Sequence, residues 1–232
     1  MDLDFEFMQP LSKVRPKCKS LKFGDDTIMI HRLELAVAVA ECIAKWASIE
    51  TLLGILLALL MKADAKTALA IHAALDNRAA QLRALNAAAK EKLSKSTQLL
   101  YEAVITAHVR PTMRERDKFA HWCWGYSSEL PKALLLMRPE EKARVHMRYA
   151  NTAQSHFDKQ KIFVITSGDL GRFEQRLDRT GHLLTRLMAC VWEKNSPQWR
   201  ASLCRRLSSE PDIREVVVRL RGRRQKNPEA PE

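Results

Sequence analysis

The stretch RLELAVAVAECIAKWASIETLLGILLALLMK, residues 32–62, decides the fold class of this chain. Its apolar residues recur at spacings of four and three, which places them along one face of an α-helix. Glu34, Glu41 and Lys45 fall elsewhere on the helix surface. The pattern predicts a long helix whose buried stripe is formed by Leu35, Val39, Cys42, Trp46, Ile49, Leu53, Leu56 and Leu60.

This helix carries more apolar surface than one core face needs. Towards its end, Leu52, Ile55, Leu57 and Leu59 widen the covered face. Surplus apolar surface of this kind marks an interface, so we expect a homodimer. The longest apolar run without a charge, residues 51–61, is shorter than the roughly 20 residues that span a bilayer. We therefore expect no membrane partner.

Helical patterns also dominate the rest of the chain. Few Gly and Pro residues interrupt it, and the stripes predict roughly two-thirds helix. Ser94, Ser96 and Thr97 supply caps for a third helix, and Pro111 either kinks that helix or opens a new one. Ser167 or Asp169 would cap a fourth long helix. The helical stretches are expected at about 65–93, after Ser94, over 112–124 up to Gly125, and from 167 to about 193.

Two short apolar runs interrupt the helical pattern. Residues 133–137 and 161–166 are bounded by Pro, Gly or Ser, which favours a two-stranded, hairpin-like element joined by a polar connection. The fold class is thus mainly α: a long-helix bundle with a small two-stranded β element and basic terminal segments. We divide it into a basic arm (1–30), a helical bundle (31–195), and short helices with a basic tail (196–232) that is disordered alone.

The charge of the chain favours polyanionic partners. Its formal net charge is +12 and its pI about 9.7. Such a surplus binds phosphates with release of counterions, so RNA is the expected partner. Five cations of the N-terminal arm are candidate nucleic-acid contacts, although a solvated arm explains them equally well: Lys13, Arg15, Lys17, Lys19 and Lys22. The start, Met1-Asp2-Leu3-Asp4, lacks a basic signal region, and we expect a cytoplasmic protein.

Metal and cofactor motifs are missing from the sequence. The five cysteines are scattered without a CxxC pair or zinc spacing, and we expect reduced thiols, with Cys42, Cys123 and Cys190 on buried helix faces. The sequence has no Gly-rich phosphate loop, no GxSxG and no HExxH. We therefore expect neither a metal nor a cofactor.

One segment, RDKFAHW at residues 116–122, gathers the residues that metal-free RNA cleavage needs. On a helix, Arg110, Arg114, Asp117 and His121 fall on one face, and Asp117 is placed to fix the tautomer of His121. Such a histidine moves protons at the ribose 2′-hydroxyl or the leaving oxygen. The guanidinium groups of Arg114 and Arg116 suit the charge on phosphorus, and Lys118 adds a further cation for the nucleic acid.

This segment resembles the signature of the HEPN family, in which an Arg followed by a polar residue precedes a His by four to six positions. Arg116-Asp117 with His121 fits that pattern, and Trp122, Trp124 and Gly125 continue it. The resemblance covers residues 31–195. It implies a dimeric helical bundle that cleaves RNA without a metal, in a toxin–antitoxin or antiphage system, with an antitoxin protein as partner. Other members of the family bind RNA without cleaving it.

Three alternatives remain open at this point. Ideal helix geometry puts Arg114, rather than Arg116, on the face of His121, so either arginine can be the catalytic one. A second match to the spacing, Arg176 with His182, has Leu177 after its Arg and is discounted. The chain can also be a non-catalytic nucleic-acid-binding or protein-binding dimer, or a purely structural bundle in which Asp117 and His121 pair on a helix surface.

Overall fold

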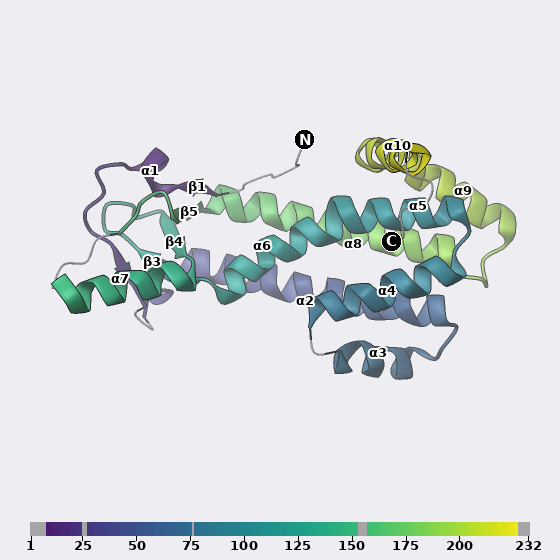
Figure 1. Cartoon of the computed structure of the whole chain (residues 1–232), viewed down its shortest axis with the longest axis horizontal. Helices are drawn as coiled ribbons and strands as arrows, with labels where there is room; N and C mark the ends of the chain where they lie inside the picture. Colours follow the sequence, from purple (N-terminus) through teal and green to yellow (C-terminus); the bar gives the residue numbers. More distant parts are fainter. Residues whose placement is uncertain (1–7, 25–26, 76, 153–156, 227–232) are drawn as a thin grey trace. The chain divides into compact units, whose positions relative to one another are not determined.

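The computed structural model describes residues 8–24, 27–75, 77–152 and 157–226 (Figure 1). The chain divides into two compact units, each formed by two separate stretches. We call Met1–Trp46 with Thr112–Arg176 the sheet unit, and Ala47–Pro111 with Leu177–Glu232 the helical unit. Helices that contribute residues to both units are α2 (Leu33–Met61), α6 (Arg110–His121) and α8 (Ser167–Val191). At 73% helix, the chain is mainly helical, as predicted.

Helix α2 buries the whole stripe that its period predicts, from Leu35 to Leu60, and Trp46 is only 1% exposed. A 3-10 turn, η1 (Ile30–Arg32), precedes it. By length and composition alone, the stretch Ile30–Met61 is apolar enough to cross a membrane, and 44% of its most apolar window is buried. The buried core helix of a globular protein meets the same criterion, so the apolar character of α2 fits a core helix as well as a membrane-spanning one.

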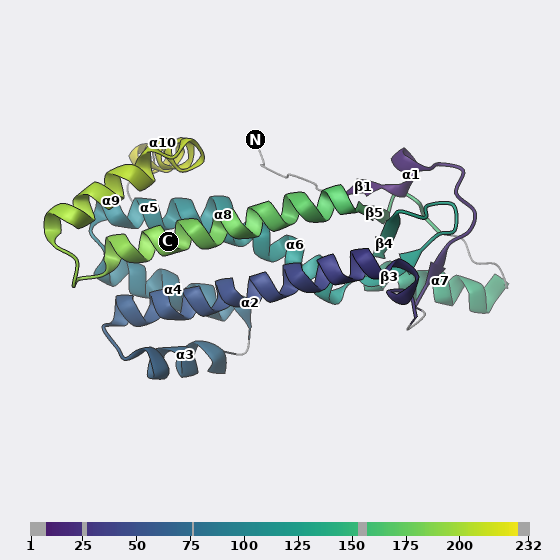
Figure 2. The same ribbon diagram turned by 180° about the vertical axis from the view of Figure 1, so that it is seen from behind.

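The prediction of one helix over residues 65–93 is wrong, because two helices share this stretch: α3 (Ala65–Ala74) and α4 (Arg78–Lys92). Leu75 leaves helical geometry, and the side chain of Asn77 caps α4 by accepting a hydrogen bond from Ala80 N at 2.8 Å. Both helices lie beside the second half of α2 (Figure 2), where Arg78 Nε is 3.2 Å from Glu50 Oε1.

The third helix begins where predicted. The side chain of Ser94 accepts from Thr97 N and opens α5 (Lys95–Val104). A π-helical segment, η2 (Ile105–Val109), then leads into α6, with Pro111 in the first turn of that helix. Pro111 thus lies inside a continuous helical path rather than at a fresh helix start. The π-helical bonding before it, with Arg110 N–H bonded to Ile105 O, changes the hydrogen-bond pattern at the position where the N–H of proline is missing.

Two helices complete the helical unit: α9 (Pro197–Ser209), capped by Ser196, and α10 (Pro211–Lys226). The prediction that the basic tail is disordered is wrong for residues 219–226, which belong to α10. Ile213, Val216 and Val217 are buried and hold that helix against the unit. The rest of the tail, residues 227–232, lies outside the described residues.

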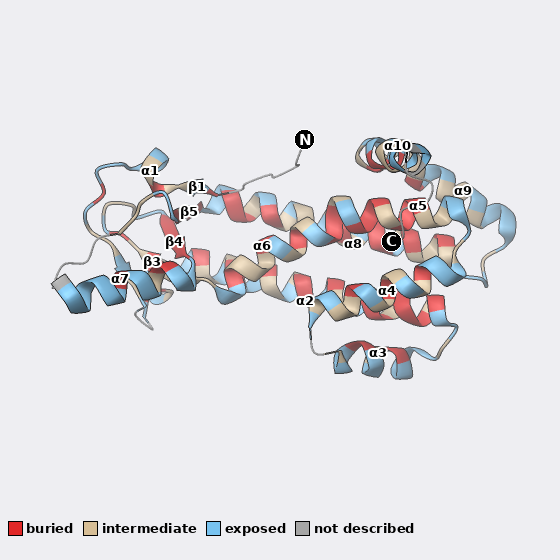
Figure 3. Ribbon diagram, viewed as in Figure 1, coloured by how far each residue is buried: buried red, intermediate tan, exposed pale blue. Residues whose placement is uncertain are grey.

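The sheet unit contains a five-stranded antiparallel sheet rather than the two strands predicted, in the order β1-β5-β4-β3-β2. The two predicted strands are present as its centre, and β4 pairs with β5 in a register that sets Leu135 opposite Val164. Strand β4 is buried along its whole length (Figure 3). The strands are β1 (Gln9–Pro10), β2 (Lys22–Phe23), β3 (Cys123–Tyr126), β4 (Ala133–Met137) and β5 (Ile162–Thr166).

Strand β3 replaces the last turn that the sequence predicts for α6. The helix ends at His121, and the next residues pair with β4, Trp124 opposite Leu136. Cys123 is therefore half-buried on a strand, not buried on a helix face. Gly125 is required here, because a Cβ atom would lie 2.5 Å from the Phe23 ring and 2.7 Å from the Lys22 carbonyl oxygen. This close approach brings β2 against β3.

The segment predicted as a basic arm contributes both edge strands and a short helix, α1 (Leu11–Val14). Leu11 and Cys18 are buried in the core of the sheet unit, together with Leu135, Ile162 and Val164. The polar connection between β4 and β5 forms the helix α7 (Pro139–Thr152), which is largely exposed (Figure 3).

Helix α8 begins with a capping box, and neither Ser167 nor Asp169, the two residues predicted as its cap, is the capping residue. Thr166 is the capping residue: its Oγ1 accepts from Asp169 N at 3.3 Å. In return, Asp169 Oδ2 accepts from Thr166 N at 2.8 Å. The last residue of β5 thus starts α8 without an intervening loop.

Candidate functional site

His121 is the last residue of α6, and its side chain is exposed. The amide N of Trp122 donates to Lys118 O at 2.9 Å, so one more helical hydrogen bond forms beyond His121 before the chain enters β3. The imidazole is therefore held at a fixed corner between a helix and a strand while remaining open to solvent. This is the position that a group exchanging protons with a large ligand needs.

Arg116 lies within two turns of His121, and its side chain is mostly buried, at 16% exposed. Its Nη1 is 3.4 Å from Asp117 Oδ1. Its Nε is buried and has no hydrogen-bond partner among the described residues. A buried N–H without an acceptor costs free energy, and burial keeps this atom out of reach of a ligand, so any phosphate contact of Arg116 falls to the outer nitrogens of the guanidinium. Arg114, the other candidate, is exposed.

The pair of Arg116 with Asp117 bears on the expected role of Asp117. Its placement one turn before His121 predicts an orienting contact with the imidazole. In the structure its Oδ1 accepts a hydrogen bond from Nη1 of Arg116 at 3.4 Å. Asp117 can thus fix the guanidinium of Arg116 in the site.

Lys118 connects the site to a buried carboxylate. Its Nζ is 2.8 Å from Oε1 of Glu115, whose residue is 8% exposed. Glu115 also acts on Arg176: burial lowers the pKa of Arg176, and the charge of Glu115 opposes that shift. Arg176 therefore balances an interior carboxylate. Arg176 and His182 belong to different units, and the surroundings of Arg176 give it a structural role.

Trp122, directly after His121, lies between cations. The Nζ of Lys118 is 5.8 Å and the Cζ of Arg138 5.3 Å from the centroid of its ring. The ring of Phe163 lies 5.6 Å away at 50°. We call Lys118, Trp122, Arg138 and Phe163 the Trp122 platform. An aromatic ring flanked by cations is the combination that binds single-stranded nucleic acid, because bases stack and phosphates pair.

Trp124 has different surroundings. Its Nε1 donates to Phe119 O at 3.2 Å, and its ring stacks on Phe119, which is 4% exposed. Phe119 in turn meets Phe173 edge to face. Trp124 is thus part of the packing that fixes the end of α6, whereas Trp122, equally half-buried, has cations beside its ring.

The five cations predicted at the N-terminus, Lys13 to Lys22, are all exposed on the segment that carries β1 and β2. The carboxylate of Glu129 holds this segment in place by accepting from the backbone N of Lys19 (2.7 Å) and Ser20 (2.9 Å). These two bonds lower the pKa of Glu129, with the bond from Ser20 the larger cause. Lys22 lies 5.6 Å from the ring centroid of Tyr126.

Tyr126 forms a second aromatic group with cations in the sheet unit. The Cζ of Arg32 lies 5.8 Å from its ring centroid, and the His31 ring lies 4.4 Å away. Sequence analysis missed this group, and also missed Arg138 and Phe163 of the Trp122 platform. Each depends on strand register, which brings together residues far apart in the sequence.

Arg110, predicted to share the face of His121, lines a cavity in the helical unit. Within the described ranges, no cluster of three or more His, Cys, Asp or Glu residues is arranged to hold a metal ion.

Comparison of the chain with protein-family models, with curated proteins and with solved structures gives no match.

Proposed function

We propose that this chain is a metal-independent endoribonuclease of the HEPN-like type, acting on single-stranded RNA in the cytoplasm as a homodimer. The observation that carries the proposal is the corner at the end of α6. An exposed imidazole, His121, directly precedes Trp122 of the platform in the chain and lies within two turns of Arg116 and of the exposed Arg114. Acid–base, stacking and phosphate-binding groups thus share one segment.

The reaction would be transesterification within the RNA. The ribose 2′-oxygen attacks the adjacent phosphorus, the bond to the 5′-oxygen breaks, and a 2′,3′-cyclic phosphate forms. His121 takes the 2′-hydroxyl proton, and the leaving 5′-oxygen gains a proton from His121 of a second copy or from water. Arg116, or Arg114, stabilises the negative charge on the phosphoryl oxygens. Asp117 orients one of these groups, either Arg116 or His121.

The test uses the full chain, purified and incubated with a fluorescently quenched single-stranded RNA in EDTA. Loss of one general acid–base group costs about 10²- to 10⁴-fold in rate, so His121→Ala should lose at least that much. Arg116→Ala should lose activity similarly. His182→Ala is the matched control, because His182 is also exposed on a helix and belongs to the discounted motif match. Equal activity in the two histidine variants would exclude His121 as the catalytic group.

A non-catalytic RNA-binding dimer is the second candidate. The Trp122 platform favours it, since an aromatic ring between cations binds RNA without any catalytic group. Wild-type protein that binds RNA with the Trp122 platform, leaves the RNA intact and is harmless when expressed would establish this candidate. Toxicity that depends on His121 would support cleavage and the search for an antitoxin partner.

A further inference from the structure

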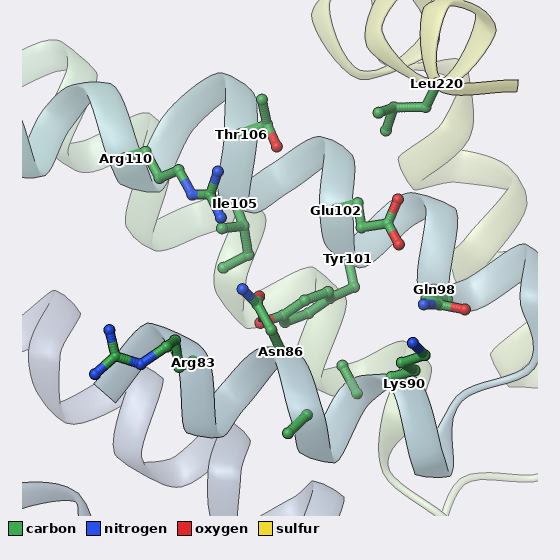
Figure 4. A pocket seen from close by; sticks show the side chains of 12 residues that line it. Arg83, Asn86, Lys90, Gln98, Tyr101, Glu102, Ile105, Thr106, Arg110 and Leu220 are labelled. Atoms are coloured by element: carbon green, nitrogen blue, oxygen red, sulfur yellow. The ribbon is translucent and has the colours of Figure 1, made fainter. Parts of the chain in front are cut away.

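A cavity in the helical unit lies between α4, α5 and the π-helical segment η2, with Leu220 of α10 at one side (Figure 4). Its volume is about 630 Å³, within the usual range for small-molecule sites, about 300–1,000 Å³. Ile105 and Thr106 of η2 contribute to its lining. π-Helical turns are rare and occur frequently at functional sites. We call this cavity the α4–α5 pocket.

The base of the α4–α5 pocket is closed by two almost fully buried side chains. Tyr101 and Ile105 are 2% and 1% exposed. The hydroxyl of Tyr101 donates to Asn86 Oδ1 at 2.8 Å, which fixes the orientation of the amide. Burial raises the pKa of Tyr101, so the phenol is neutral and keeps its proton for this bond. The amide N–H₂ of Asn86 is then the end of that group directed to other acceptors.

The charge of the α4–α5 pocket is predominantly positive. Arg83, Lys90 and Arg110 line it together with a single carboxylate, that of Glu102. In Figure 4 the ends of Arg110, Asn86 and Tyr101 converge, and the positive charge of Arg110 opposes the rise in the pKa of Tyr101. Guanidinium groups bind phosphate through paired N–H donors, which a lysine or a neutral amide cannot do alone.

From this arrangement we propose that the α4–α5 pocket binds a nucleoside phosphate. Arg110 would hold the phosphate, with the Asn86 amide beside it. Gln98 and Asn86 would form hydrogen bonds to the base or ribose. The volume accommodates an organic body as well as the anion, so inorganic phosphate alone would leave most of the pocket unfilled. This site is separate from the His121 corner and does not depend on RNA cleavage.

Calorimetric titration of the full chain tests the proposal with adenosine 5′-monophosphate, adenosine and inorganic phosphate as probes. The monophosphate cannot be cleaved by attack of its 2′-hydroxyl on an internucleotide phosphate, so binding is measured independently of ribonuclease activity. It should bind more tightly than either adenosine or phosphate. Loss of a charged hydrogen bond is worth about tenfold or more, so Arg110→Gln should weaken binding by at least that factor.

Arg205→Gln is the matched control, since Arg205 is exposed on α9 and does not line the pocket. Unchanged binding in this variant is expected. A competing RNA that carries a 5′-phosphate would identify an RNA end as the source of the ligand, whereas competition by free nucleotide alone would identify a small effector. Absence of binding at millimolar monophosphate overturns the proposal. So does an equal loss in the Arg110 and Arg205 variants, or phosphate binding as tightly as the nucleotide.

Discussion

Trp122 and Trp124 are two positions apart and differ in what they contact. Trp122 is half-buried between Lys118 and Arg138, whereas Trp124 donates to the backbone and stacks on Phe119. Base stacking on an aromatic ring is worth about 1–3 kcal/mol, roughly 5- to 150-fold in affinity. We expect Trp122→Leu to weaken binding of a single-stranded RNA by that factor with little loss of stability. Fluorescence anisotropy measures the affinity.

Two further variants control this prediction. Trp199→Leu removes a tryptophan that is 50% exposed in the helical unit, and it should leave RNA affinity unchanged. Trp124→Leu should lower the free energy of unfolding, because it removes buried stacking and a hydrogen bond. Equal RNA affinity in wild type and Trp122→Leu would contradict the assignment of a ligand-binding role to the Trp122 platform.

At the residue scale, sequence could indicate only those site residues that are close in the chain. The spacing of Arg116, Asp117 and His121 is visible because all three belong to one helix. Arg138 and Phe163 reach the platform through the pairing of β3, β4 and β5, and no local pattern marks them. Whether the carboxylate of Asp117 contacts Arg116 or His121 depends on the side-chain rotamer of Asp117, which sequence spacing does not determine.

At the scale of elements, the start of α8 gives a direct test of local structure. Asp169 is 9% exposed and accepts hydrogen bonds from both the backbone N and the hydroxyl of Thr166. Loss of a helix cap typically costs about 1 kcal/mol, and Asp169→Ala should lower the free energy of unfolding by at least that amount. Gln175→Ala, an exposed change on the same helix, should leave it nearly unchanged. Urea denaturation compares the two.

A second element-scale prediction concerns acid. A hydrogen bond from Arg179, 2.9 Å from Oε2 of Glu210, is the largest cause that lowers the pKa of Glu210, and Arg186 also pairs with this carboxylate. The ionised Glu210 carboxylate, paired with these arginines, stabilises the folded state fully above its ordinary pKa of about 4.5. This contribution is lost as the pH falls through the lowered pKa of the folded state. We expect thermal stability to fall below pH 4.5, and less steeply in Glu210→Gln. The exposed Glu215→Gln should keep the wild-type pH dependence.

Helices with a strong stripe could be predicted, whereas elements held by pairing could not. The period of α2 identifies each buried residue of its stripe from Leu35 to Leu60. The edge strands β1 and β2 have two residues each, too few for any alternation to appear. Helix α7 buries little beyond Val145 and Glu141, so its sequence shows hardly any apolar stripe. Asn77 caps the start of α4 inside the stretch predicted as one helix. The alanine-rich pattern on both sides of it does not indicate this break.

At the scale of the whole molecule, the proposed ribonuclease depends on a second copy of the chain. The apolar surplus near the end of α2, from which the sequence predicts a dimer, is not exposed: Leu57 is buried, and Leu52, Ile55 and Leu59 are half-buried within the chain. The exposed apolar stripe lies at the other end, on η1 and the start of α2, where Ile30, Leu33 and Val37 are 72%, 67% and 50% exposed. Their spacings of three and four set them along one helix face. Exposed Ala40 and Ala44 continue this face, where small side chains would let a second helix approach closely. A patch of this kind marks an interface.

We therefore expect a homodimer that buries this stripe, in which two His121 corners serve one RNA. Val37→Glu should convert the dimer to a monomer, because a carboxylate would lose its water without gaining a partner. Val218→Glu is the control: Val218 is 63% exposed on α10, and its change should leave the dimer intact. Light scattering after size-exclusion chromatography measures the mass. If cleavage needs two copies, Val37→Glu should lose ribonuclease activity together with the dimer, while keeping its helical circular dichroism. A wild type that is monomeric at micromolar concentration, and still cleaves RNA, would show that one copy is sufficient and that another molecule covers the stripe.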